Sequence, residues 1–216
     1  MRCVTAPGIF YCQAGPRLIF LDVNQDRYFQ LSADLEAAFQ AAIDGRLYSE
    51  QAVSTLIARG VLCSAETDTV SLPAQPLLPS RAADMLRAEA SVMEAVKAVF
   101  AQIRAQKDLE REGLGWVIAS LQWPEDRPAI ALIHDPVPAR IVRAFEHAKL
   151  VRTPANRCLS RSIALVRQLA AQGCRVHLVL GVRGIPFTAH AWVQTDDIVL
   201  NDSPEEVARF TPIFVL

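Results

Sequence analysis

The sequence predicts an α+β protein in two parts: a small three-stranded sheet followed by helices, then a larger domain of helices packed on an antiparallel sheet. Three observations predict this class. Short runs rich in Ile, Phe, Tyr and Leu alternate with turn residues at the start of the chain, and two segments of helical period follow them. A proline-rich stretch at 71–80 separates this opening from the rest. After Gly173 the helical period changes to strand alternation.

The first part has the pattern of a small sheet with two helices. Three short strands separated by Ala-Gly-Pro and Asn-Gln-Asp turns are predicted at residues 9–12, 17–23 and 27–31. The first helix is predicted to begin after Ser32 and to end at Gly45, and the second to run from Ser49 to Arg59 and end at Gly60. Such a unit is typical of a winged-helix-like domain, which by itself indicates no function.

The stretch from Ser71 to Ser80 contains three prolines, so it can form neither a helix nor a central strand. We interpret it as an extended linker. The sequence therefore predicts a first domain over residues 1–75, the end of the linker over 76–80, and a second domain over 81–216.

The second part begins with helical patterns. Ser80 is expected to start a long helix that Gly113 and Gly115 interrupt, and another helix is predicted over Ala139 to Val151. One apolar stripe of the long helix is predicted to face the core; it comprises Met85, Val92, Val96, Val99, Phe100 and Ile103. Asn156 can cap a further helix. After Gly173, this helix is followed by alternating segments typical of strands.

Composition excludes several classes of partner. The chain has 22 basic and 23 acidic residues, so nucleic acid or an anionic membrane is not expected as the main partner. Its five cysteines are odd in number and lack the clustering of a zinc site, which favours a reducing cytoplasm and no metal. Cys174 and His177 alone are too few ligands. Neither a signal peptide nor an apolar run of about 18 residues is present, so we expect a cytoplasmic protein.

The stretch from Asn156 to Asp202 has the pattern of a thiol active site. Cys158 is predicted at the positive end of a helix dipole, which favours the nucleophilic thiolate. His190 lies in an alternating segment, and a hairpin centred on Asp196 would place Asp202 opposite it. A base oriented by an acid and pointed at a thiol is the general form of nucleophile activation. Asp196 and its neighbour Asp197 compete for the role of the acid but are more typical of the turn.

Two further expectations concern the surroundings of this site. Trp192 is predicted to pack beside the imidazole of His190. The side chains of Arg157, Arg161 and Arg167 are predicted to form a solvated helix face.

The strings Cys158-Leu159 and Ala189-His190-Ala191-Trp192-Val193, followed by Asp202, resemble the transglutaminase-like cysteine peptidases called lasso peptide biosynthesis B proteins. The resemblance spans nearly all of residues 80–216. It implies a transglutaminase- or papain-like fold in which Cys158, His190 and Asp202 are catalytic. One departure is Gln194, where relatives often carry Glu, which argues against an additional acid at that position.

The opening of the chain resembles the precursor-recognition domain of the peptide chaperone of pyrroloquinoline quinone biosynthesis. The similar strings are Leu21-Asp22-Val23 and Arg27-Tyr28-Phe29-Gln30-Leu31. In that family the leader peptide adds as a strand to the exposed sheet edge, so main-chain hydrogen bonds give affinity and side-chain pockets give selectivity. The resemblance implies substrate binding by residues of the edge strand and the next helix, namely Arg27, Tyr28, Phe29, Gln30, Leu31, Leu35 and Phe39.

Together the two resemblances imply a leader peptidase that binds a lasso precursor and hydrolyses the bond between leader and core. They also imply that the freed core passes to an ATP-dependent, asparagine-synthetase-like cyclase, while the peptidase itself needs no cofactor. Two alternatives remain open. The chain could be a thiol acyltransferase of the same superfamily, in which an amine accepts the acyl group, or a leader-binding module without catalytic activity.

Overall fold

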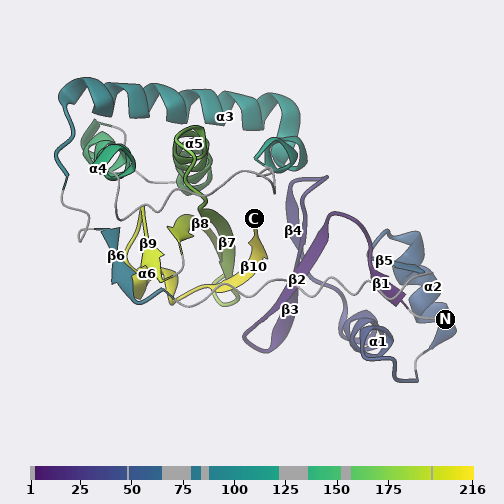
Figure 1. The fold of residues 1–216 in the computed structure, drawn as a ribbon. Helices are drawn as coiled ribbons and strands as arrows, with labels where there is room; N and C mark the ends of the chain where they lie inside the picture. The colour runs from purple at the N-terminus through teal and green to yellow at the C-terminus, as the bar shows by residue number, and fades with distance from the viewer. Residues whose placement is uncertain are drawn as a thin grey trace.

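A computed structural model describes residues 3–47, 49–64, 79–83, 88–121, 136–151, 157–195 and 197–216. The chain has a mixed α+β fold, which confirms the predicted class. Figure 1 shows a larger body in which helices are stacked over a sheet, and a smaller body beside it that holds the N-terminus. Most of the predicted linker lies outside the described residues, and so does the predicted helix cap at Asn156.

The three predicted N-terminal strands are present. They form an antiparallel sheet in the order β2 (Ile9–Ala14), β3 (Arg17–Asp22) and β4 (Arg27–Phe29). The middle strand is buried on both faces, since Leu18 and Phe20 belong to one core cluster and Ile19 and Leu21 to another. A strand with two buried faces requires a continuous apolar run, which this one has. Among the described residues, no strand pairs with the outer edge of β4.

Two helices follow the sheet, as predicted: α1 (Ala33–Ile43) and α2 (Glu50–Ala58). Ser32 and Ser49 occupy their N-cap positions, and the Ser49 side chain accepts a hydrogen bond from the backbone N–H of Ala52. A short ladder between β1 (Cys3–Thr5) and β5 (Leu62–Ser64) closes this part. Strands of this length are too short to give a periodic signal in the sequence.

Phe39 is a core residue of the N-terminal part. Its side chain is 1% exposed, and its ring lies 4.9 Å from the rings of both Phe20 and Tyr11. The expectation that Phe39 contacts a bound peptide is therefore wrong for the described fold. Leu35 is half-buried and packs against the same cluster.

The long helix begins later than predicted. Residues after Ser80 form β6 (Arg81–Ala82), and α3 (Val92–Ser120) begins at a capping box in which Ser91 and Glu94 bond reciprocally. The pattern Ser-x-x-Glu at this point distinguishes the real cap from Ser80. Gly113 breaks the helix with φ 79° and ψ 169°, as predicted.

Part of the predicted apolar stripe faces solvent rather than the core. Val92 is 82% exposed and Phe100 is 66% exposed, so the prediction is wrong for these residues. Val99 packs against the large core cluster, and Met85 lies outside the described residues. Before the break at Gly113, the buried residues of α3 are Ala98, Gln102 and Ala105. Small side chains let α3 lie close to the two helices beneath it, because interaxial distance depends on the residues at the contact. Among the described helices, none is both long and apolar enough to cross a membrane.

The larger sheet has the strand order β10-β7-β8-β9-β6 and is antiparallel except for its last pair. Its remaining strands are β7 (His177–Arg183), β8 (Thr188–Thr195), β9 (Ile198–Val199) and β10 (Thr211–Val215). Its associated helices are α4 (Pro136–Val151), α5 (Cys158–Ala171) and the short α6 (Pro204–Val207). In Figure 1, α4 and α5 lie between this sheet and α3.

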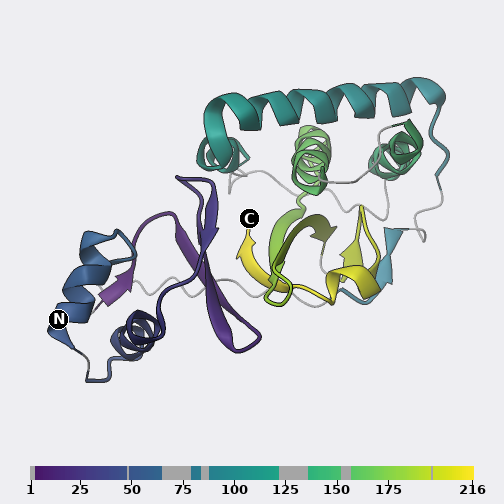
Figure 2. The same cartoon turned by 180° about the vertical axis from the view of Figure 1, so that it is seen from behind.

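The two parts share a core. The largest cluster of buried side chains joins Ile19 and Leu21 of β3 to residues of the helices and the larger sheet, such as Leu114 and Leu180. Phe10 meets Phe214 edge to face with ring centroids 4.8 Å apart. Figure 2 shows the three-stranded sheet standing between the larger body and the helices α1 and α2. The domain boundary at 75–80 remains a prediction.

Candidate active site

Cys158 is the first residue of α5, and Arg157 occupies the N-cap position. The helix therefore begins one residue later than a cap at Asn156 would give, and the side chain of Arg157 makes no capping hydrogen bond. The sulfur still lies at the helix N-terminus, where unpaired backbone N–H groups favour a negative charge. The thiol is half-buried and packs against the large core cluster.

His190 and Asp202 come together as predicted, although by a different register. The hairpin pairs Gln194 with Val199, whereas a centre at Asp196 would pair Gln194 with Ile198. Asp202 lies beyond the end of β9 rather than within the ladder. Its Oδ2 atom is 2.8 Å from Nε2 of His190, which leaves Nδ1 of the imidazole for the Cys158 sulfur.

The charges of these three groups depend on one another. Burial raises the pKa of the Cys158 thiol, but the hydrogen bond and charge of His190 and bonds to the backbone outweigh burial, so this pKa is lowered. Burial lowers the pKa of His190, but hydrogen bonds with Asp202 and Cys158 raise it to about 9. Burial raises the pKa of Asp202, and the bonds with His190 and the backbone of Ser203 lower it overall. These shifts favour a thiolate beside an imidazolium at neutral pH.

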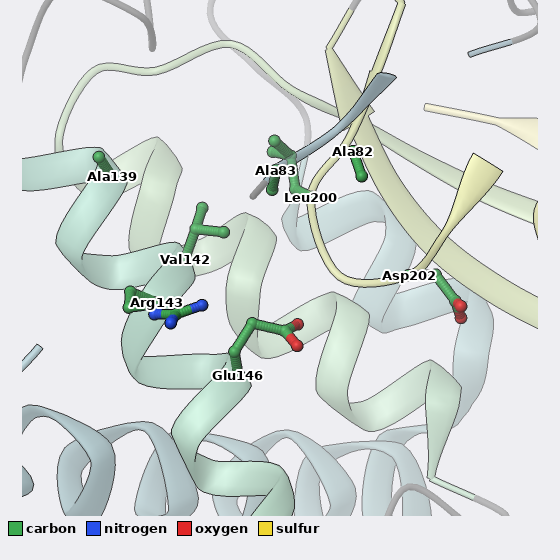
Figure 3. Close-up of a pocket in the computed structure, with 8 residues that line it drawn as sticks. All are labelled: Ala82, Ala83, Ala139, Val142, Arg143, Glu146, Leu200 and Asp202. Carbon is green, nitrogen blue, oxygen red and sulfur yellow. The ribbon is translucent and has the colours of Figure 1, made fainter. Parts of the chain in front are cut away.

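A pocket of about 210 Å³ opens at these three side chains. Its other lining residues are Arg161, Ala189, Ala191 and Asn201. A second pocket of about 170 Å³ adjoins it and shares Asp202. Figure 3 shows Arg143 and Glu146 projecting into this second pocket from α4, with Asp202 on the opposite wall. The candidate site is thus a pair of adjoining pockets that meet at Asp202.

Comparison with protein families matches residues 103–215, more than half of the chain, to the Transglutaminase-like superfamily. The matched residues include Cys158, His190 and Asp202. The chain belongs to the transglutaminase-like superfamily.

A curated relative of this transglutaminase-like protein is the microcin J25-processing protein McjB of Escherichia coli. The two are 28% identical over 97 residues, which cover 45% of this chain and 46% of McjB. The alignment thus spans about half the length of the relative. The comparison with solved structures gave no match.

Arg161 is an internal part of the transglutaminase-like site, so its predicted place on a solvated face is wrong. It lies three residues after Cys158 on the buried side of α5 and is 6% exposed. Its Nη2 atom donates to the backbone oxygen of Asn201 at 2.7 Å and to Glu146 at 2.9 Å. Arg167 is also partly buried and binds Asp108. Arg161 therefore ties the segment that carries Asp202 to α5.

Asn201 is a second residue that sequence reasoning missed. Its Oδ1 atom accepts from the backbone N–H of Val193 at 2.8 Å, and its Nδ2 atom donates to the hydroxyl of Ser162 at 2.8 Å. That hydroxyl donates to the backbone oxygen of Ala191 at 3.0 Å. These bonds hold the segment after β9 against β8. In the sequence, this role of Asn201 is indicated only by its position next to Asp202.

Trp192 and Asp197 agree with prediction. Trp192 stacks beside the imidazole with ring centroids 6.0 Å apart, and its Nε1 atom donates to Gln194. Asp197, the competing acid, binds Arg81 through both oxygens at 2.8 and 3.0 Å. Asp196 lies outside the described residues. Across the part of the chain that the structure describes, no three His, Cys, Asp or Glu side chains are grouped as metal ligands would be.

The predicted peptide-binding residues divide between two faces of β4. A pocket of about 270 Å³ lies on one face. Four of the predicted residues line it: Arg27, Phe29, Gln30 and Leu31. The rest of its lining consists of Ile9, Asp22, Arg59 and Val61. Tyr28 packs on the opposite face against the large core cluster. A pocket is thus lined in part by residues of β4, the strand beside which the sequence predicts a bound leader.

Proposed function

We propose that this chain is a cysteine peptidase of lasso peptide maturation, which binds the precursor leader through residues 1–75 and cleaves the leader–core bond through residues 81–216. The observation that carries the proposal is the grouping of Cys158, His190 and Asp202 in the lining of one pocket. The resemblance to lasso peptide biosynthesis B proteins and the similarity to a microcin J25-processing protein support the substrate class.

In the first half of the reaction the Cys158 thiolate adds to the scissile carbonyl carbon. The backbone N–H of Cys158, at the start of α5, is placed to donate to the developing oxyanion. The imidazolium of His190 then gives its proton to the leaving nitrogen as the C–N bond breaks. The products are a leader thioester and a core peptide with a free N-terminal amine.

In the second half water replaces the amine. Neutral His190 takes a proton from the attacking water, the thiolate leaves the thioester carbonyl, and the leader is released with a free carboxylate. Asp202 holds the ring through Nε2 so that Nδ1 stays directed at the sulfur. In this role it stabilises the imidazolium without being protonated itself.

The edge of β4 supports the binding step. An extended leader can extend the three-stranded sheet there by main-chain hydrogen bonds, with its side chains in the pocket beside Arg27 and Phe29. We further propose that the reaction takes place in the cytoplasm and that the freed core passes to an ATP-dependent, asparagine-synthetase-like cyclase. No step assigned to this chain uses ATP.

The test is mass spectrometry of the precursor encoded beside this gene after incubation with wild-type protein or Cys158→Ala, each with and without the cyclase and ATP. Binding of the precursor is first verified by fluorescence anisotropy. We expect wild-type protein to give leader and core whose masses sum to the precursor plus one water, and Cys158→Ala to bind without cleaving. A product in which an amine has joined the leader would instead indicate an acyltransferase. Binding without cleavage under every condition would leave only a leader-binding module.

A further inference from the structure

The turn between β7 and β8 lies against the N-terminal sheet. A Cβ atom at Gly184 would lie 2.4 Å from the backbone oxygen of Ala14, so only glycine permits this approach. In the same turn, the Phe187 ring lies 5.5 Å from the Tyr28 ring of β4. The turn therefore joins the strand with the free edge to the strand that carries His190.

Tyr28 is close to the catalytic residues as well as to the turn. Tyr28, Cys158 and Ala189 all pack against the same core cluster. The pKa of Tyr28 is raised to about 12, chiefly by burial and next by the negative charge of the Cys158 thiolate. The aromatic pair thus joins the turn before β8 to a β4 side chain that interacts with the Cys158 thiolate.

Phe187 has an exposed ring that no core packing requires. It is 52% exposed, although a buried position is usual for a ring of this size. It precedes His190 by three residues, in the turn that leads into β8. A half-exposed ring that leans on a second ring offers an apolar wall to a passing chain.

We propose that Tyr28 and Phe187 form an aromatic subsite for the leader residues just before the scissile bond, guiding a leader that is bound on β4 toward Cys158. The ligand class is an extended peptide with apolar side chains at those positions. This inference rests on the proposed function and adds to it the path from the binding strand to the nucleophile.

The test measures access to Cys158 independently of cleavage. Iodoacetamide labelling of Cys158 is followed by peptide mass spectrometry, with two synthetic peptides taken from the precursor encoded beside the gene: the complete leader and a leader that lacks its last few residues. We expect the complete leader to slow labelling of wild-type protein and the shortened one not to. In Phe187→Ala we expect this protection, and kcat/KM for precursor cleavage, to fall roughly tenfold. Binding of the shortened leader should change less than about twofold.

Ile185→Ala is the matched control, because Ile185 is exposed on the same turn. It should leave protection and cleavage unchanged, and Phe187→Leu should be intermediate if Phe187→Ala is destabilised. The subsite proposal would be overturned if Phe187→Ala retained the protection of Cys158 and the cleavage rate of the wild type. It would also be overturned if Phe187→Ala weakened binding of the shortened leader as much as it reduced protection by the complete leader. If wild-type protein cleaves nothing but Phe187-dependent protection persists, the subsite stands and the peptidase proposal fails.

Discussion

Replacing Asp202 with Asn tests whether this carboxylate keeps His190 charged. Oδ2 of Asp202 lies 2.8 Å from Nε2 of His190, and this bond helps to raise the pKa of His190 to about 9. Asn has nearly the same shape but no charge, so the substitution removes the ion pair with little change in packing. In the proposed mechanism activity requires the imidazolium, so it should be lost as the pH rises through the pKa of His190. We expect Asp202→Asn to move this alkaline limit from about 9 to a lower pH.

The size of the effect follows from the strength of the lost bond. A hydrogen bond to a charged partner contributes about 1.5–3 kcal/mol, and about 1.4 kcal/mol corresponds to a factor of ten, so kcat/KM near neutral pH should fall about 10- to 100-fold. The rise of the His190 pKa from 6.5 to about 9 is worth about 3 kcal/mol at about 1.36 kcal/mol per unit. Cys158 shares in that rise, so part of the shift should survive in the variant.

The assay is the pH profile of kcat/KM for precursor cleavage, from acid to alkaline solution, with thermal melting as a check of folding. Asp197→Asn is the matched control, because it removes an acid of the same hairpin that binds Arg81 and not His190. Its profile should match the wild type. An alkaline limit that stays in place in Asp202→Asn would refute the assignment of Asp202 as the group that holds the imidazolium.

Three further predictions concern stability. Arg161→Met should lower the free energy of unfolding in urea by about 3 kcal/mol, because it breaks a buried ion pair. Arg167→Met breaks a more exposed ion pair and should lower it by less than about 1 kcal/mol. Equal losses in the two variants would contradict this ranking. Gly181→Ala would place a Cβ atom 2.7 Å from the Trp192 ring, so it should cost about 1–3 kcal/mol by thermal melting and reduce cleavage; wild-type stability would show that the ring can move. Phe39→Ala should cost about 3–5 kcal/mol in the same measurement, and a loss of leader binding without destabilisation would instead return Phe39 to the binding surface.

The grouping of Cys158, His190 and Asp202 could be predicted because each has a local sign. A cysteine at a helix start and a histidine in an alternating segment are visible in one sequence, and the hairpin brings the acid near. The register could not be fixed, because a hairpin centred on Asp196 and the observed pairing of Gln194 with Val199 both agree with the same polar sequence. His190 and Asp202 meet in spite of the different register, because Asp202 lies beyond the end of β9 and its side chain reaches the imidazole.

The packing of α3 and the role of Arg161 could not be predicted. Helical period identifies an apolar stripe such as Val92 and Phe100, but it cannot show which side another helix will cover. Here the opposite side, with Ala98 and Ala105, is the one that packs. Arg161 is hidden for a related reason: its partners, among them Glu146, lie on other elements, and a buried cation is indistinguishable in sequence from an exposed one.

The alternation of β4 explains how one strand can serve both binding and delivery. Successive side chains of a strand point to opposite faces, so Arg27 and Phe29 line the pocket at the sheet edge while Tyr28 faces the catalytic part. A peptide added beside β4 must alternate in the same way. If the proposed function holds, alternate leader residues would therefore be recognised by two surfaces, and a shift of one residue in register would exchange them. Binding and positioning would then be selected together by a single register.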